Sequence, residues 1–216
     1  MDPEARDRRH EEYDYWRYEG RDWRWFEHIL VRMRAVPPVL DVGAGLGLFT
    51  ECCARHHIRA VAMELSRQGT AAIASRGLAV VRGDLWQPFP FRDDAFGSAL
   101  AHHVLEHVPV EREDGVLREI RRVLRPGGFL FVVSPNPHNP GARDDADHIN
   151  LFTAHELFRK LRGAGFRKVS LGTNYWRPVW ESLIRLGRIG PLLSGALWKV
   201  APIDRFAGTS SAMAWK

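Results

Sequence analysis

The sequence contains little cysteine and no long apolar segment. Its 216 residues include two cysteines, Cys52 and Cys53, and adjacent positions in a helix do not readily reach disulfide geometry. No apolar run approaches the roughly 20 residues that a membrane-spanning helix needs. The first residues mix acids, arginines and aromatics and lack the apolar stretch of a secretory signal. We therefore expect reduced, buried thiols and a cytoplasmic protein.

The sequence also lacks a concentrated charge of one sign. Its 31 lysines and arginines exceed its 26 aspartates and glutamates and give a formal net charge of +5, but the arginines are scattered among the acids throughout the chain. A basic protein suits nucleic acid or anionic lipid only where its charges gather on one surface. The composition therefore argues against nucleic acid as the partner.

Short apolar segments alternate with amphipathic segments over most of the chain. This alternation predicts a Rossmann-like α/β fold, a seven-stranded and mostly parallel sheet with helices on both faces. The expected strands are 39–42, 58–63, 78–82, 96–101, 129–133, 166–171 and 210–215. The expected helices are 21–35, 48–57, 66–76, 116–124 (ending at Pro126-Gly127-Gly128) and 153–162. We expect one domain over 1–216, with a helical N-terminal segment (1–35), a core (36–172), a helical insertion (173–208) and a last strand (209–216).

A glycine-rich loop follows the first expected strand. Gly43, Gly45 and Gly47 allow a sharp turn and a close approach of the backbone to a ligand, and the next helix offers free N–H groups. A dinucleotide-binding G-x-G-x-x-G motif would need glycine at position 48, where the chain has Leu48. The loop therefore indicates a nucleotide-like ligand other than NAD.

Two acids occupy the ends of the next two expected strands. Glu64 lies roughly 20 residues after the first glycine, where an acid in such folds binds ribose hydroxyls. Asp84 ends the third strand in the same way. A glycine loop followed in order by these two acids is far more specific for a nucleotide-like ligand than a glycine loop alone.

With these motifs the chain resembles the class I S-adenosylmethionine-dependent methyltransferases, in particular the type 11 group that includes the ubiquinone-biosynthesis enzymes. The resemblance covers about residues 36–170. It rests on the segments Val39–Gly47, Glu64, Asp84-Leu85, Val104–His107 and Leu124–Gly128. It implies that the cofactor is S-adenosylmethionine. By the resemblance, its methionine part is bound by Asp41, Gly43, Gly45 and Gly47. Its ribose is bound by Glu64, and its adenine is bound by Asp84 and Leu85. Ala44, Leu65 and His102 complete the implied cofactor site.

The acceptor side departs from the family or is less defined. Gly97 stands where relatives often carry aspartate. The stretch Asp147–Thr153 resembles a family motif that borders the acceptor pocket, which makes His148 the first candidate base, with Asp147 orienting it, although a structural histidine fits as well. His103 is the second candidate base.

His103 to His107 also fits the H-x-x-E-H spacing of one zinc peptidase class. The segment lies inside the methyltransferase pattern, so we expect Glu106 and His107 to be structural. A sulfonium methyl group is already electrophilic, so the transfer needs no metal, and we expect none.

The remaining candidates are aromatic or apolar. Tyr15 and Trp16 either line the acceptor site as part of an N-terminal lid or pack against the sheet edge. Residues 176–200 either cover an apolar acceptor, touch a membrane surface, or pack in the core or at a dimer interface.

We expect an O- or N-methyltransferase, monomeric or homodimeric, that acts on a small, partly apolar metabolite such as a phenol, a sugar or a lipid-linked intermediate. An RNA methyltransferase and a non-catalytic, cofactor-binding partner subunit are the alternatives.

Overall fold

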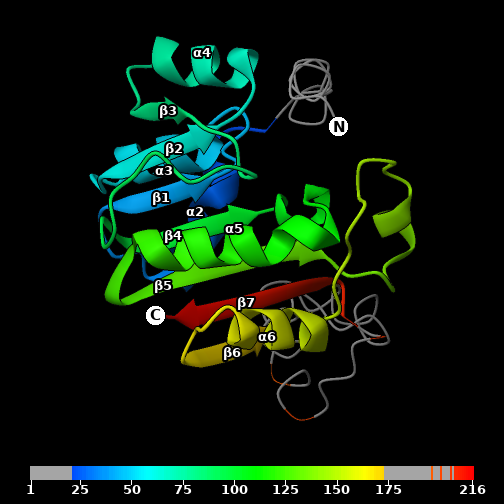
Figure 1. Cartoon of the computed structure of the whole chain (residues 1–216). Helices are drawn as coiled ribbons and strands as arrows, with labels where there is room; N and C mark the ends of the chain where they lie inside the picture. The colour runs from blue at the N-terminus through cyan, green and yellow to red at the C-terminus, as the bar shows by residue number, and fades with distance from the viewer. Residues whose placement is uncertain (1–20, 173–195, 197–199, 201–204, 206) are drawn as a thin grey trace. The chain divides into compact units, whose positions relative to one another are not determined.

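The computed structural model describes residues 21–172, 196, 200, 205 and 207–216, and it contains the predicted seven-stranded sheet (Figure 1). The strand order is β3-β2-β1-β4-β5-β7-β6. The strands are β1 (Val39–Val42), β2 (Ala60–Glu64), β3 (Val80–Arg82), β4 (Phe96–His102), β5 (Leu124–Pro135), β6 (Lys168–Gly172) and β7 (Thr209–Trp215). The helices are α2 (Glu27–Met33), α3 (Leu48–Arg55), α4 (Arg67–Ser75), α5 (Val110–Val123) and α6 (Ala154–Gly163), with 3-10 turns η2 (Trp23–Phe26), η3 (Leu105–His107) and η4 (Pro140–Arg143).

The chain divides into two compact units. The first comprises residues 1–100 and 122–129, and the second comprises residues 101–121 and 130–216. Within the described ranges, no helix has both the length and the apolar character needed to traverse a bilayer.

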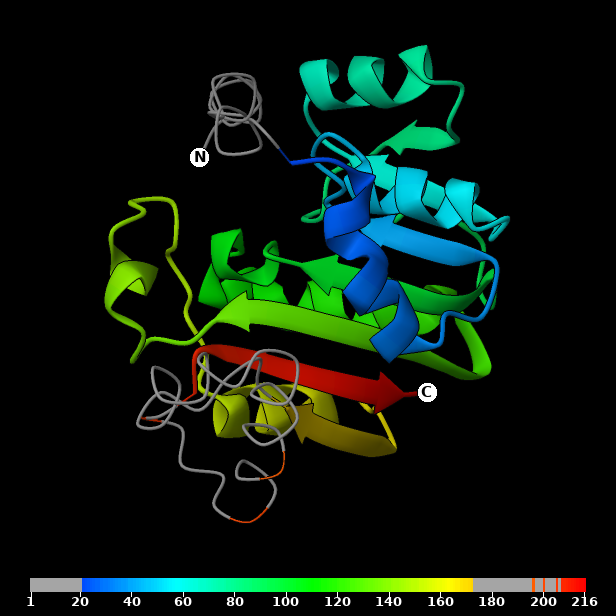
Figure 2. The same cartoon turned by 180° about the vertical axis from the view of Figure 1, so that it is seen from behind.

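In the first unit, β1, β2 and β3 pair in parallel, with Asp41 opposite Ala62 and Met63 opposite Val81. Every residue of β1 is buried, as expected for a strand covered on both faces. Helices α2 and α3 lie behind β1 in Figure 1 and in front of it in Figure 2, so they share one face of this part of the sheet. Apolar side chains of this unit that are almost fully buried include Met33, Leu40, Phe49, Met63 and Ile73.

The two cysteines lie in α3, where both are buried and neither forms a disulfide bond. Burial raises the pKa of the Cys52 thiol to about 11, and it raises the pKa of Cys53 as well. Both groups therefore stay protonated thiols at neutral pH, which leaves no thiolate for nucleophilic chemistry. The expectation that both thiols are buried is confirmed.

Gly97 is explained by a close approach of two backbone segments. Its N–H donates to the Pro38 carbonyl oxygen at 2.9 Å, and the neighbouring Ser98 hydroxyl bonds both the N–H and the carbonyl of Val36. A Cβ at position 97 would lie 2.5 Å from the Val36 carbonyl oxygen, a distance at which the backbone must move. The chain thus has glycine where aspartate is common in the group that it resembles, because a side chain does not fit.

We expect Gly97→Ala to lower the free energy of unfolding by about 1–3 kcal/mol, because the new methyl group meets a backbone atom that has little room to yield. The matched control is Gly115→Ala in α5, where an added Cβ meets nothing within 4 Å. That substitution should stabilise the protein by about 0.5–1 kcal/mol through helix propensity. Urea unfolding measures the free energy of unfolding of both variants. Changes of the same sign and size in the two variants would contradict the packing argument.

In the second unit, β6 and β7 pair antiparallel, with Lys168 opposite Trp215. Helix α6 begins with a capping box, in which Thr153 and Glu156 each accept a hydrogen bond from the other's backbone N–H. The carboxylate of Glu113 on α5 is fully buried and is held by Lys160 of α6 and by the side-chain amide of Asn150. This ionic contact joins α5, α6 and the loop that precedes α6.

The structure corrects the expected boundary between the fourth expected helix and the fifth expected strand. The sequence predicted a helix ending at Pro126-Gly127-Gly128 and a strand over 129–133, but α5 ends at Val123 and β5 runs from Leu124 to Pro135. A Cβ at Gly128 would lie 2.9 Å from the carbonyl oxygens of both Arg125 and Gly97. Gly128 is therefore required by a close backbone approach within the sheet rather than by a helix cap.

Candidate functional site

The glycine loop of the first unit turns sharply between β1 and α3. Gly43, Gly45 and Gly47 have φ values of 65°, 56° and 71°, a left-handed conformation that other residues seldom adopt. The N–H groups of Gly43 and Ala44 both donate to the Met63 carbonyl oxygen, at 2.9 and 3.1 Å. The loop is thereby fastened to β2, and Gly47 forms the N-cap of α3.

Glu64 joins the glycine loop to the end of β2. One carboxylate oxygen accepts from Gly45 N at 2.7 Å, and the other accepts from Ser66 N at 2.9 Å. The side chain is buried, and this burial raises the pKa of the carboxyl even though the backbone N–H groups oppose the rise. A carboxylate offers about four acceptor positions, so capacity is left for a ligand's hydroxyl groups.

Two residues that the sequence did not mark as functional complete this arrangement. Ser66 caps α4, and its hydroxyl accepts from Gly69 N at 2.9 Å. A Cβ at Gly69 would lie 2.6 Å from the Gly45 carbonyl oxygen and 2.8 Å from Cγ of Glu64. A glycine in the first turn of a helix is the sequence signal that identifies this close approach.

Asp41 is buried at the base of the loop. Its carboxylate accepts from the Thr50 hydroxyl of α3 at 2.8 Å. Burial raises the pKa of Asp41 to about 7, the Thr50 hydrogen bonds oppose the rise, and the charge of Glu64 adds to it. A cationic ligand group near Asp41 would favour its ionised form.

The raised pKa of Asp41 predicts a pH dependence of stability in the ligand-free protein. The folded state holds this proton more tightly than the unfolded state, so the free energy of unfolding falls as pH rises from about 4 to about 7. A change in pKa from 3.8 to about 7 corresponds to about 4 kcal/mol at most. The amide of Asp41→Asn does not titrate in this range. Between pH 5 and pH 7.5 we therefore expect the free energy of unfolding of Asp41→Asn, measured in urea, to rise by about 2–3 kcal/mol relative to that of wild type. Parallel pH profiles of the two proteins would contradict this assignment.

The predicted adenine-side residues, Asp84 and Leu85, follow β3 in a tight turn. Asp84 accepts from Trp86 N through its carboxylate at 2.8 Å and from Gln87 N through its carbonyl at 3.1 Å. Leu65 and Leu85 are both half-buried, and the Leu65 carbonyl accepts from Arg82 Nε at 2.8 Å. The segments after β2 and β3 are thus held together.

In the second unit, His103 is paired with a buried acid. Nδ1 of its ring lies 3.1 Å from a carboxylate oxygen of Glu106. Its backbone N–H donates to the Val133 carbonyl oxygen, and its backbone φ is 52°. Its side chain is 37% exposed, which leaves part of the ring accessible, whereas the Glu106 side chain is fully buried. Burial would raise the pKa of Glu106, but the His103 hydrogen bond and the charges of His103 and His107 outweigh it and lower the pKa. His102, at the end of β4, stacks edge-on against His103 with ring centroids 4.4 Å apart.

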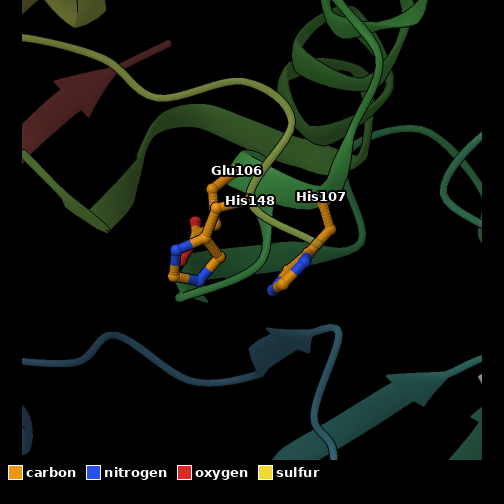
Figure 3. A group of neighbouring side chains, drawn as sticks. All are labelled: Glu106, His107 and His148. Carbon is orange, nitrogen blue, oxygen red and sulfur yellow. The ribbon is translucent and has the colours of Figure 1, made fainter. Parts of the chain in front are cut away.

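His148 lies beside His107, with ring centroids 5.2 Å apart (Figure 3). Its Nδ1 contacts the Ala142 carbonyl at 2.8 Å, and its Nε2 lies 3.5 Å from the Asp145 carboxylate. The acid beside this ring is therefore Asp145, whereas the Asp147 carbonyl contacts His107 Nδ1 at 3.0 Å. Within the second unit, the structure thus places His103, Glu106, His107 and His148 near one another.

Two further expectations fall outside the described residues. Tyr15 and Trp16, predicted as acceptor-binding residues of an N-terminal lid, belong to residues 1–20. Of the apolar insertion over 176–200, only positions 196 and 200 are described. Both expectations stay predictions.

Part of this chain matches known methyltransferases in sequence. Residues 40–132 match the family described as the methyltransferase domain. The chain is 33% identical over 114 residues to a demethylmenaquinone methyltransferase of Mycobacterium tuberculosis, covering 53% of this chain and 47% of that protein. It is 34% identical over 118 residues to phthiotriol/phenolphthiotriol dimycocerosates methyltransferase 1 of Mycobacterium ulcerans, covering 50% of this chain and 41% of that protein. The chain therefore spans less than half the length of these two curated relatives.

A solved structure of a SAM dependent methyltransferase from Archaeoglobus fulgidus has the same fold. It superposes with a TM-score of 0.72 at 19% identity and covers 94% of this chain and 99% of that chain. At this identity the likeness extends to the fold, which agrees with the architecture predicted from the sequence.

Proposed function

We propose that the chain transfers the methyl group of S-adenosylmethionine to a small, partly apolar metabolite, because residues 40–132 match the family described as the methyltransferase domain. The observation that carries the proposal is the double hydrogen bond from Gly45 N and Ser66 N to the Glu64 carboxylate. It holds an acid with spare acceptor capacity against a loop that a ligand can approach closely.

The residues of the first unit fit the expected cofactor in charge and shape. Glycines open the loop, Glu64 offers acceptors for a diol, and the buried Asp41 carboxyl suits a cationic group such as an amino acid ammonium. The proposal assigns the methionine part to Asp41, Gly43, Gly45 and Gly47, the ribose to Glu64, and the adenine to Asp84 and Leu85, with Ala44 and Leu65 as further cofactor-binding residues. His102 belongs to the second unit, and the family resemblance alone assigns it to the cofactor.

S-adenosylmethionine supplies, when bound, a methyl group on a sulfonium whose thioether leaves readily. The chain's own residues orient the acceptor, exclude water and remove a proton where the acceptor is a hydroxyl. We assign proton removal to Nε2 of His103, because Glu106 accepts from the other ring nitrogen and so leaves the lone pair on Nε2. His148 is the other expected candidate, and its Nε2 lies 3.5 Å from the Asp145 carboxylate.

The acceptor class is supported by the names of the two relatives. One is named for demethylmenaquinone and the other for phthiotriol and phenolphthiotriol dimycocerosates. An apolar acceptor also agrees with the apolar composition of residues 176–200. The dispersed charge of the chain favours such an acceptor over RNA.

The test is a methyl-transfer assay with purified protein, S-adenosylmethionine and a panel of quinols, phenols, sterols, sugars and RNA. S-adenosylhomocysteine formation and the methylated product are both detected by mass spectrometry. We expect turnover with at least one quinol or phenol and none with RNA. Methylation of RNA alone would contradict the proposed acceptor class, and cofactor binding without any turnover would favour a non-catalytic partner subunit.

A further inference from the structure

Three potential metal ligands of the second unit converge on one point. Glu106 and His107 belong to η3, and His148 belongs to the loop before α6, and one ligand atom from each lies within 4.8 Å of the other two. Figure 3 shows the carboxylate and the two rings gathered on the same side of η3. The loop is fixed against η3, because Ile149 N and Asn150 N both donate to the Glu106 carbonyl at 3.0 Å.

One oxygen of the Glu106 carboxylate lacks a hydrogen-bond partner among the described residues. One oxygen accepts from His103 Nδ1, but the other, Oε2, is buried and has no hydrogen-bond partner among the described residues. An unpartnered oxygen on a fully buried carboxylate is expensive, and proteins usually satisfy it with a donor or a cation. The side chain is 0% exposed, so a cation at this position would be bound out of bulk solvent.

Both histidines are oriented as metal-binding histidines usually are. A backbone carbonyl only accepts, so the contacts of His107 Nδ1 with Asp147 O (3.0 Å) and of His148 Nδ1 with Ala142 O (2.8 Å) place a proton on each Nδ1. In a neutral ring the lone pair then resides on Nε2. A backbone carbonyl on the far nitrogen is the usual outer-shell partner of a metal-binding imidazole. The Asp145 carboxylate, 3.5 Å from His148 Nε2, adds further negative charge.

We propose that Glu106, His107 and His148 form a binding site for a divalent first-row transition-metal ion, with zinc as the reference case. Two imidazole nitrogens and one carboxylate oxygen suit Zn²⁺, Fe²⁺, Co²⁺ or Mn²⁺ better than Mg²⁺ or Ca²⁺, which prefer oxygen ligands alone. Ligand atoms at about 2.1 Å from a tetrahedral zinc ion lie about 3.4 Å apart, so separations near the 4.8 Å limit must shorten on binding. Such a movement is within the reach of side-chain rotation.

The site has consequences for the roles of its neighbours. Three protein ligands leave at least one position of a tetrahedral ion for water or for an oxygen of a small molecule. His148 becomes a ligand in this arrangement, and proton removal is left to His103. The inference departs from the expectation that no metal is bound, and it does not depend on the proposed methyl transfer.

The experiment titrates Co²⁺ and Zn²⁺ into full-length protein that has been stripped with a chelator and freed of it. Co²⁺ binding is followed by visible absorption, and Zn²⁺ binding by calorimetry, in the absence of S-adenosylmethionine. We expect one ion per chain, and the loss of either His107 or His148 to alanine should weaken binding by at least about 100-fold, more than an outer-shell partner does. The matched control, His155→Ala at an exposed position of α6, should change affinity less than twofold.

Folding is checked separately from binding. Far-ultraviolet circular dichroism and S-adenosylhomocysteine binding identify a variant that has lost its structure, and His148→Gln serves as a milder second variant of the same ligand. One equivalent of metal that is lost in His107→Ala and in both His148 variants supports the site. Absence of stoichiometric binding to wild type, or binding that depends on His155 and not on His107 and His148, overturns it.

Discussion

Replacing Glu64 by glutamine should weaken S-adenosylhomocysteine binding by at least about 100-fold. The two carboxylate oxygens accept from Gly45 N and Ser66 N, so an amide of the same shape must turn its NH₂ toward one of these donors. The substitution also removes the charge that strengthens hydrogen bonds to a diol. Two hydrogen bonds to a charged group contribute about 1.5–3 kcal/mol each, and a loss of about 3 kcal/mol is more than a 100-fold change in affinity.

The matched control is Glu27→Gln at an exposed position of α2 in the same unit. It removes the same charge away from the glycine loop, so affinity should change less than twofold. Calorimetry measures both variants, and thermal unfolding verifies that Glu64→Gln remains folded. A folded Glu64→Gln variant with the affinity of wild type would show that the cofactor does not use this acid.

Replacing His103 by asparagine should lower kcat by about 100- to 10,000-fold with a hydroxyl acceptor, because a positioned base typically contributes that much. Asparagine tolerates positive φ, so it suits the 52° at this position while removing the imidazole. Cofactor affinity should be unchanged, since His103 is not among the residues assigned to the cofactor. Steady-state kinetics with the acceptor identified in the panel measure the effect.

His57 supplies a control with the same backbone conformation. It is exposed, lies after α3 and has a φ of 58°, so His57→Asn makes the same chemical change at a comparable backbone site. Its kcat should stay within twofold of wild type. If His103→Asn also retains full turnover with a hydroxyl acceptor, His103 is not the base.

The sheet and most of its helices could be predicted from the sequence because their signals are local. The strand 39–42 is an apolar segment bounded by Pro38 and Gly43, and Thr153 with Glu156 at the start of α6 is a capping box. The end of α5 could not be predicted in this way. Pro126-Gly127-Gly128 has the composition of a helix stop, but Gly128 is required by its approach to the Gly97 carbonyl, and that contact joins residues far apart in the sequence.

The same distinction applies to the sites. The loop 43–47 and Glu64 form a motif of fixed spacing, and the structure brings Gly45 and Glu64 within hydrogen-bond distance as that motif implies. The pairing of Thr50 with Asp41 and the approach of Gly69 to Gly45 depend on how α3 and α4 pack. The grouping of His148 with Glu106 and His107 joins positions about 40 residues apart, and no spacing rule connects them.

The central claim is that the chain binds S-adenosylmethionine through its glycine loop, and titration of folded wild-type protein tests it most directly. Calorimetry with S-adenosylmethionine, S-adenosylhomocysteine and NAD distinguishes the two kinds of nucleotide-like ligand that such a loop serves. The account predicts one site per chain for each of the first two ligands and no binding of NAD. Folded protein that binds NAD, or that binds neither sulfur-containing ligand, would contradict it.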